Sequence, residues 1–221
     1  MNGGQRLWKV IVSPSQAFQA VKEEPGLLFP AALFLVIMVA ATLLVGPETR
    51  QYTIELLTKQ GTPSSQIEIA LSSLTLWSVI GVVISYPLLW LLQALALLIY
   101  NQIALGEGKF KQLFAVAVLS SVPTVIHQII ASGLIKAMGM QAALQVNTSL
   151  AVLMGSDNQT FLYRFLAYFD IFTIWGLALL ALGGAVVMNK SVKGTGLYIL
   201  VLWLILAVGM AFLGGLFPTT V

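Results

Sequence analysis

An all-α, polytopic integral membrane protein with five transmembrane helices is the fold class that this sequence predicts. Hydrophobic residues make up 58% of its 221 residues and charged residues only 9%, whereas soluble domains carry about 25% charged residues. Several apolar runs also reach the roughly 20 residues that a helix needs to cross the hydrocarbon core of a bilayer. A very apolar soluble domain is the alternative, but it does not account for runs of this length.

Helix-start signals precede the first apolar run. Ser13 is an expected N-cap, Pro14 suits the first helical position, and Gln16 completes a capping box with Ser13. The helix that follows should end near Glu24, because Pro25 comes next. The stretch "RLWKVIV" before it is a second short amphipathic piece. Together they predict interfacial helices in a cytoplasmic juxtamembrane segment, residues 1–25.

That N-terminal segment has two interpretations. It is either an ordinary juxtamembrane anchor or a docking surface for a protein partner at the cytoplasmic face. The residues that would form the docking surface are Trp8, Ser13, Pro14 and Phe18.

Residues 26–221 form the expected membrane domain. Its five spans cover about residues 27–45, 74–103, 110–134, 165–188 and 197–217. The first run follows two charged clusters, and no small-residue cleavage site comes after it. We therefore expect a retained span rather than a cleaved signal peptide.

Two stretches between the spans carry helical patterns. Residues 48–60 place apolar and aromatic side chains at helical spacing, and Thr62-Pro63 predicts the start of a helix that runs into the second span. The loop from residue 139 to 164 contains "MQAALQVNTSLAVLMG". We expect this stretch to form a semi-apolar helix on the outer interface or against the bundle.

Lysine-rich turns orient the spans. An odd number of spans places the two termini on opposite sides of the membrane. The short turns "GEGKFK" and "NKSVK" belong in the cytoplasm by the positive-inside rule. The N-terminus is then cytoplasmic, and the C-terminus, with its uncharged "FPTTV" end, is outside.

Two ionisable residues lie inside apolar segments, where polar groups are costly. Asp170 is the only acidic residue in an expected span, and His127 is the only histidine. Helical rise places them roughly 8 and 10 Å from the outer ends of their spans, so an Asp–His pair is feasible if the two helices are neighbours. Asp170 is a structural carboxylate, a proton- or ion-linked group, or a substrate contact; His127 alone is a structural hydrogen-bonding residue.

Other polar and small residues in the spans have a packing interpretation and a functional one. The polar residues either join helices or line a small cavity beside the proline bends at Pro87 and Pro123; they are Gln93, Ser120, Ser121, Thr124 and Gln128. A small-residue stripe in the fifth span permits close helix approach within the chain or across a homo-oligomer; it comprises Ala207, Ala211 and Gly215.

Several function classes find no support in the sequence. Without cysteine there are no disulfides, thiolate ligands or catalytic thiols, and a net charge of +3 is too small to indicate nucleic acid. No phosphate-binding loop, metalloprotease motif or nucleophile elbow occurs. One histidine and one intramembrane acid do not make a metal site. We therefore expect no catalytic residues, no cofactor and no metal.

The order of features resembles the Yip domain family, the five-span membrane proteins that include the Yip and YIPF proteins and their bacterial relatives. The matching residues are "LWKVIVSPSQAF", Pro87, "GEGKFKQLFAVAVLSSVP" and "FDIFTIWGLALLALGGAVV", followed by a basic turn and a last apolar span. The resemblance implies a cytoplasmic N-terminus and an outside C-terminus. The chain lacks the long N-terminal extension of eukaryotic members, so it resembles the compact bacterial form, and we expect it in the bacterial inner membrane.

Two functions follow as hypotheses. The first is a non-enzymatic membrane adaptor or organiser that binds proteins or lipids, and it depends mainly on the resemblance. The alternative is a small transporter or channel that uses a polar cavity between the second, third and fourth spans, with Asp170 and His127 as its ionisable pair. A lipid-remodelling role is a third class that no particular residue favours.

Overall fold

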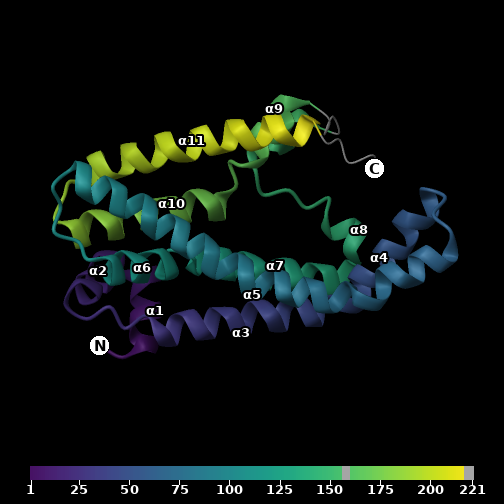
Figure 1. The fold of residues 1–221 in the computed structure, drawn as a ribbon, viewed down its shortest axis with the longest axis horizontal. Helices are drawn as coiled ribbons and strands as arrows, with labels where there is room; N and C mark the ends of the chain where they lie inside the picture. Colours follow the sequence, from purple (N-terminus) through teal and green to yellow (C-terminus); the bar gives the residue numbers. More distant parts are fainter. Residues whose placement is uncertain (156–159, 217–221) are drawn as a thin grey trace. The chain divides into compact units, whose positions relative to one another are not determined.

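The structure, a computed structural model, describes residues 1–155 and 160–216, and every regular element in them is helical (Figure 1). The elements are α1 (Gly3–Val12), α2 (Pro14–Glu23), α3 (Leu28–Leu44), α4 (Gly46–Lys59), α5 (Ser64–Ile103), α6 (Phe110–Leu119), α7 (Val122–Met138), α8 (Met140–Ala143), the 3-10 helix η1 (Leu150–Met154), α9 (Phe161–Ala167), α10 (Ile171–Met188) and α11 (Val192–Leu216). The predicted all-α class is confirmed.

Among the residues that the structure describes, four helical stretches are long and apolar enough to cross a membrane: Ser64–Ile103, Phe110–Met138, Ile171–Met188 and Val192–Gly215. A fifth is obtained if α3 and α4, which are bent by 51° relative to each other, count as one span. These helices confirm the class of polytopic membrane protein. The expected end of the fifth span, Phe217, and the C-terminal tail after it lie outside the described residues.

Prolines and an aspartate set the boundaries of these helices. The stretch Phe110–Met138 is interrupted between α6 and α7, directly before Pro123, because proline cannot continue the hydrogen-bond pattern of the preceding turn. By contrast, α5 continues through Pro87. The apolar run from Phe165 is also divided: α9 ends at Ala167, and α10 begins only at Ile171, after its N-cap Asp170.

The N-terminal residues form two helices, as the sequence predicts, but the predicted capping box is wrong. Ser13 is the N-cap of α2, yet its side chain makes no capping hydrogen bond. Gln16 Oε1 instead accepts a hydrogen bond from Lys9 Nζ at 2.8 Å. The capping box lies at α1, where Asn2 Oδ1 accepts from Gln5 N at 2.8 Å and Asn2 N donates to Gln5 Oε1.

Of the two stretches between the spans, the first has the predicted helical structure and the second does not. Residues 46–59 are helical as α4, and α5 starts directly after Thr62-Pro63 and runs without interruption to Ile103, as predicted. The semi-apolar helix expected from "MQAALQVNTSLAVLMG", residues 140–155, is wrong. That stretch contains the single turn α8 and the short η1, separated by irregular backbone.

The chain divides into two compact units. The first unit contains residues 1–32, 89–124 and those from Thr148 on, so it includes α1, α2, the C-terminal part of α5, α6, η1, α9, α10 and α11. The second contains residues 33–88 and 125–147, with most of α3, α4, the N-terminal part of α5, most of α7, and α8.

Candidate functional site

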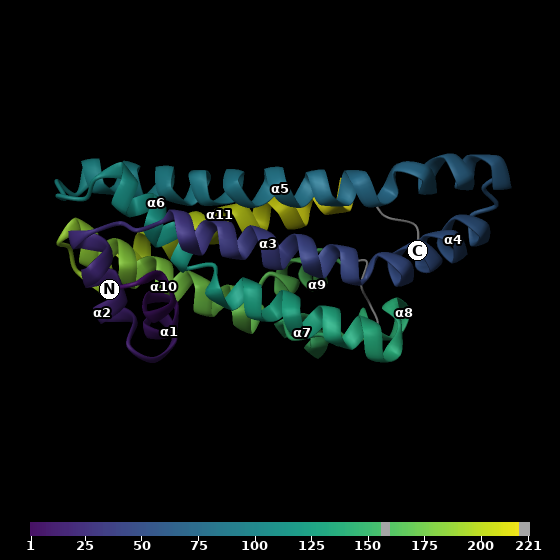
Figure 2. The same cartoon turned by 90° about the horizontal axis from the view of Figure 1, so that it is seen from below.

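In the first unit the N-terminal hairpin, α1 and α2, packs beside α6 and α10 (Figure 2). Phe18 of α2 is fully buried. Its ring occupies the space left by Gly183 of α10, where a Cβ would meet Phe18 Cε1 and Val116 Cγ1 at 2.7 Å each. Full burial of such a side chain contributes roughly 1.5–3 kcal/mol. The hairpin is therefore part of the core of this unit.

Polar contacts also hold the part of the first unit where the hairpin packs beside α6 and α10. Gln112 Nε2 of α6 donates to the Lys22 carbonyl near the end of α2 at 2.5 Å. Asn101, only 3% exposed, holds the turn between α5 and α6: its Nδ2 donates to Gly108 O at 3.0 Å, and its Oδ1 accepts from Gly108 N at 3.1 Å. The lysine-rich turn of the sequence is thus a defined structure next to the hairpin.

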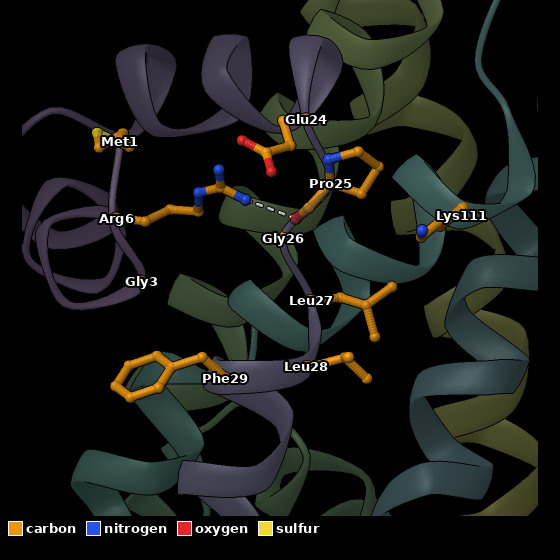
Figure 3. Close-up of a pocket in the computed structure, with 10 residues that line it drawn as sticks. All are labelled: Met1, Gly3, Arg6, Glu24, Pro25, Gly26, Leu27, Leu28, Phe29 and Lys111. Carbon is orange, nitrogen blue, oxygen red and sulfur yellow. Dashed lines mark hydrogen bonds between the residues drawn. The ribbon is translucent and has the colours of Figure 1, made fainter.

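Arg6 of α1 holds the linker between α2 and α3 (Figure 3). Its Nη1 donates to the Pro25 carbonyl at 2.6 Å, and the residue is 2% exposed. Gly26 follows with φ +50, and a Cβ on it would collide with Arg6 Nη1. Glycine therefore serves two purposes here: it adopts the left-handed conformation at low cost, and it leaves room for the guanidinium.

A cavity of about 390 Å³ opens beside this contact. Arg6, Glu24 and Lys111 supply its charged lining, and the start of α3 supplies apolar side chains. Burial lowers the pKa of the Arg6 guanidinium from its ordinary value, and the Glu24 carboxylate acts in the opposite direction. Arg6 still carries its charge, because an arginine is not deprotonated in proteins. We refer to this space as the Arg6 cavity.

The residues predicted to form a docking surface do not share one exposed face. Trp8 is 64% exposed, with Ile11 and Val12 also exposed on α1. Ser13 and Pro14 are half-buried at the bend of the hairpin. Phe18 faces the core and offers no surface to a partner. An exposed apolar face therefore exists on α1, centred on Trp8.

The polar residues predicted inside the spans of the first unit have different environments. Trp90 Nε1 of α5 donates to Ser121 Oγ at 2.8 Å, and Ser121 Oγ donates to Ala117 O at 3.2 Å, so this hydroxyl joins two helices. The neighbouring Ser120 Oγ and Gln93 Oε1 are buried without a hydrogen-bond partner among the described residues. Thr124 is half-buried near the start of α7.

Asp170 is the N-cap of α10. Its Oδ1 accepts from Phe172 N at 2.8 Å and Thr173 N at 3.2 Å, and Oδ2 accepts from the Thr148 hydroxyl. The first two bonds satisfy two of the free N–H groups of the first helical turn and give the carboxylate a structural role. His127 and Gln128 belong to the second unit, so the Asp170–His127 pair stays a prediction.

The second unit contains a small cavity of about 90 Å³, lined by polar and apolar side chains from α3, α4, α5 and α7. Its polar lining consists of Thr42, Thr49, Thr75, Ser78 and Gln128. Elsewhere in this unit, Lys136 Nζ of α7 and Glu48 Oε1 of α4 form an ion pair at 2.6 Å.

The small-residue stripe of the fifth span is used within the chain. Ala207 and Ala211 are buried in the first unit. Gly215 lies against the Arg164 side chain of α9, where a Cβ would meet Arg164 Nη2 at 2.8 Å. This environment favours internal packing over a contact between copies.

Sequence reasoning missed Arg6, Asn101 and Gln112. Arg6 looked like one cation of an amphipathic helix, and only its neighbours in space show that it is buried. Asn101 had a usable signal, since it is an amide near the end of a long apolar run and directly before a glycine-rich turn.

Within residues 1–155 and 160–216, no group of three or more His, Cys, Asp or Glu side chains could hold a metal ion.

Comparison with protein families gives a match over nearly the whole chain. The family model described as "Yip1 domain" matches residues 8–213, which is nearly the whole chain. The match confirms the resemblance that the sequence motifs indicate. No curated protein and no solved structure matches the chain.

Proposed function

Since this chain belongs to the Yip1 domain family, we propose that it is a non-enzymatic membrane adaptor that binds a protein partner through the exposed face of α1. The observation that carries the proposal is the rigid mounting of the hairpin. Phe18 and Val21 are buried in the core of the first unit, while Trp8, Ile11 and Val12 remain exposed. A surface that is fixed to the membrane domain loses little conformational entropy when it binds.

The proposed orientation places this surface in the cytoplasm and the C-terminus outside, in a bacterial inner membrane. Support comes from the two lysine-rich turns, which lie at the hairpin's end of the first unit. Asn189 Nδ2 donates to Glu107 Oε2 at 3.4 Å between these turns, and Gln112 joins the α5–α6 turn to α2. Short basic loops are retained in the cytoplasm by the positive-inside rule.

The test introduces a negative charge on the exposed face. Trp8→Glu should abolish recovery of a partner at near-equal amount after crosslinking in cells and purification in mild detergent. Gln19→Glu is the matched control, because Gln19 is an exposed position of α2 and the substitution adds the same charge. Undiminished capture by a folded Trp8→Glu protein contradicts the docking role of α1.

The second candidate is a small transporter or channel. It is supported by the cavity of the second unit, whose polar lining includes Gln128, and by the ionisable residues Asp170 and His127. The expected first span lines this cavity and the fourth does not, so the cavity differs from the predicted one between the second, third and fourth spans. It predicts a proton- or solute-dependent flux in liposomes that Asp170→Asn abolishes. Full flux in both Asp170→Asn and His127→Ala variants rules out this mechanism.

A further inference from the structure

The Arg6 cavity contains a buried cation whose hydrogen bonds are incomplete. Arg6 Nη1 donates to the neutral carbonyl of Pro25, and Nε is buried without a partner among the described residues. The Glu24 carboxylate offsets part of the cost of burying this charge, but no ion pair joins it to Arg6 among the described residues. A buried charge with one neutral acceptor is costly unless an anion completes its hydrogen bonds. The site therefore favours a negatively charged occupant.

The charges that line the cavity agree with this reading. Arg6 and Lys111 are positive and Glu24 is negative, so the lining is net positive. In Figure 3 the linker around Gly26 runs between Arg6 and Lys111. Arginine is suited to phosphate, because its planar group donates two parallel hydrogen bonds to phosphate oxygens.

The rim of the cavity is apolar, and this distinguishes a lipid from a free ion. Leu28 is 80% exposed and Phe29 is 54% exposed, and both line the cavity at the start of α3. A phosphate ion from water gains nothing from these neighbours. A phospholipid does, because its first acyl carbons can cover such side chains while its phosphate reaches the guanidinium.

We infer that the Arg6 cavity binds the phosphodiester headgroup of an anionic phospholipid. Arg6 donates to the phosphate oxygens while Nη1 keeps its bond to Pro25, and Lys111 adds a second positive charge. Leu28 and Phe29 contact the acyl chains. This site goes beyond the partner contact proposed above, since none of these residues belongs to the exposed face around Trp8.

Lipid binding is measured on the full-length, delipidated protein in detergent by native mass spectrometry. The probes are dioleoyl phosphatidylglycerol and, for comparison, dioleoyl phosphatidylcholine. We expect tighter binding of phosphatidylglycerol, and we expect Arg6→Gln to weaken it at least tenfold. Lys111→Gln should weaken it about fivefold, the effect of one cation at an anionic membrane surface. Equal binding of both lipids, or unchanged phosphatidylglycerol binding in both variants, overturns the inference.

Lys193→Gln is the matched control. Lys111 is the second residue of α6 and Lys193 the second residue of α11, and both are exposed, but only Lys111 lines the cavity. Lys193→Gln should bind phosphatidylglycerol like the wild type. If Arg6→Gln does not fold, as judged by gel filtration and circular dichroism, the comparison of Lys111→Gln with Lys193→Gln decides. An equal loss in these two variants shows general charge attraction and contradicts a site.

Two further arms separate the source of the phosphate and the role of Glu24. Inorganic phosphate or a phosphorylated peptide should not displace the lipid at millimolar concentration, and displacement by either one contradicts a lipid site.

Glu24→Gln should strengthen phosphatidylglycerol binding by removing a negative charge. If it instead destabilises the protein as much as Arg6→Gln and leaves lipid binding unchanged, Glu24 is the counter-ion and the inference is wrong. Trp8→Glu should keep full lipid binding, so failure of the adaptor proposal is measured separately.

Discussion

The guanidinium of Arg6 donates a hydrogen bond to the backbone carbonyl of Pro25 at 2.6 Å, and this bond joins α1 to the segment that enters α3. The two residues that it joins lie before and after α2 in the sequence. It ties the hairpin to the linker that leads into α3, and Gly26 makes the approach possible.

Replacing Gly26 by alanine should destabilise the protein by two additive effects. The left-handed φ of +50 costs a residue with a Cβ roughly 1–2 kcal/mol, and the Cβ also displaces Arg6. Gly61→Ala is the control, because Gly61 has φ +75 and nothing within 4 Å of its Cβ position. Thermal unfolding in detergent should show the larger loss for Gly26→Ala. Equal losses would mean that the Arg6 contact adds nothing.

Gly183→Ala tests the packing of Phe18. The added Cβ lies 2.7 Å from Phe18 Cε1 and from Val116 Cγ1, so the hairpin or α10 has to move. Such overpacking costs typically about 1–3 kcal/mol. Gly209→Ala in α11 meets nothing within 4 Å and should be neutral or stabilising. Urea or thermal unfolding of both variants makes the comparison, and a neutral Gly183→Ala would contradict the close packing of α2 on α10.

Adjacent serines at the break between α6 and α7 should respond differently to alanine. Ser121→Ala removes the hydrogen bond from Trp90 Nε1 and should cost about 0.5–1.5 kcal/mol. Ser120 Oγ is buried without a partner among the described residues, so Ser120→Ala should be neutral or stabilising. The unfolding midpoints of the two variants test this expectation. A lower midpoint for Ser120→Ala than for Ser121→Ala would show that Ser120 is the serine that joins helices.

Asp170 variants separate a cap from an ionisable centre. Asp170→Asn keeps an acceptor for Phe172 N and Thr173 N and should unfold close to the wild type. Asp170→Ala loses the cap and should cost about 0.5–2 kcal/mol. A large loss of stability in Asp170→Asn would instead indicate that the charge itself is required. The flux measurement of the transport alternative uses the same Asn variant, so stability and activity are read from one protein.

Local rules predicted the helices well, because local chemistry sets helix ends. Pro14 begins α2, and the break before Pro123 follows from the missing N–H of proline. The capping box failed because Lys9, seven residues earlier, competes for Gln16 through a hairpin that local rules do not describe.

The candidate site was harder to predict than the fold. Phe18 and Arg6 look like exposed residues of short amphipathic helices, and their burial depends on Gly183 and on the linker at Gly26. Contacts between residues so distant in sequence leave no periodic signal. The resemblance to the family pointed to these segments, but it did not say which side chains face the core.

The contact between Phe18 and Gly183 constrains the order in which the protein assembles. The two residues are 165 positions apart, and ribosomes add about 5–20 residues per second, so α10 follows α2 by roughly 8–30 s. During that interval α1 and, once made, α6 are available to α2, but the surface of α10 that receives Phe18 is missing. The N-terminal hairpin thus reaches its native position only after the helix that receives it has been inserted.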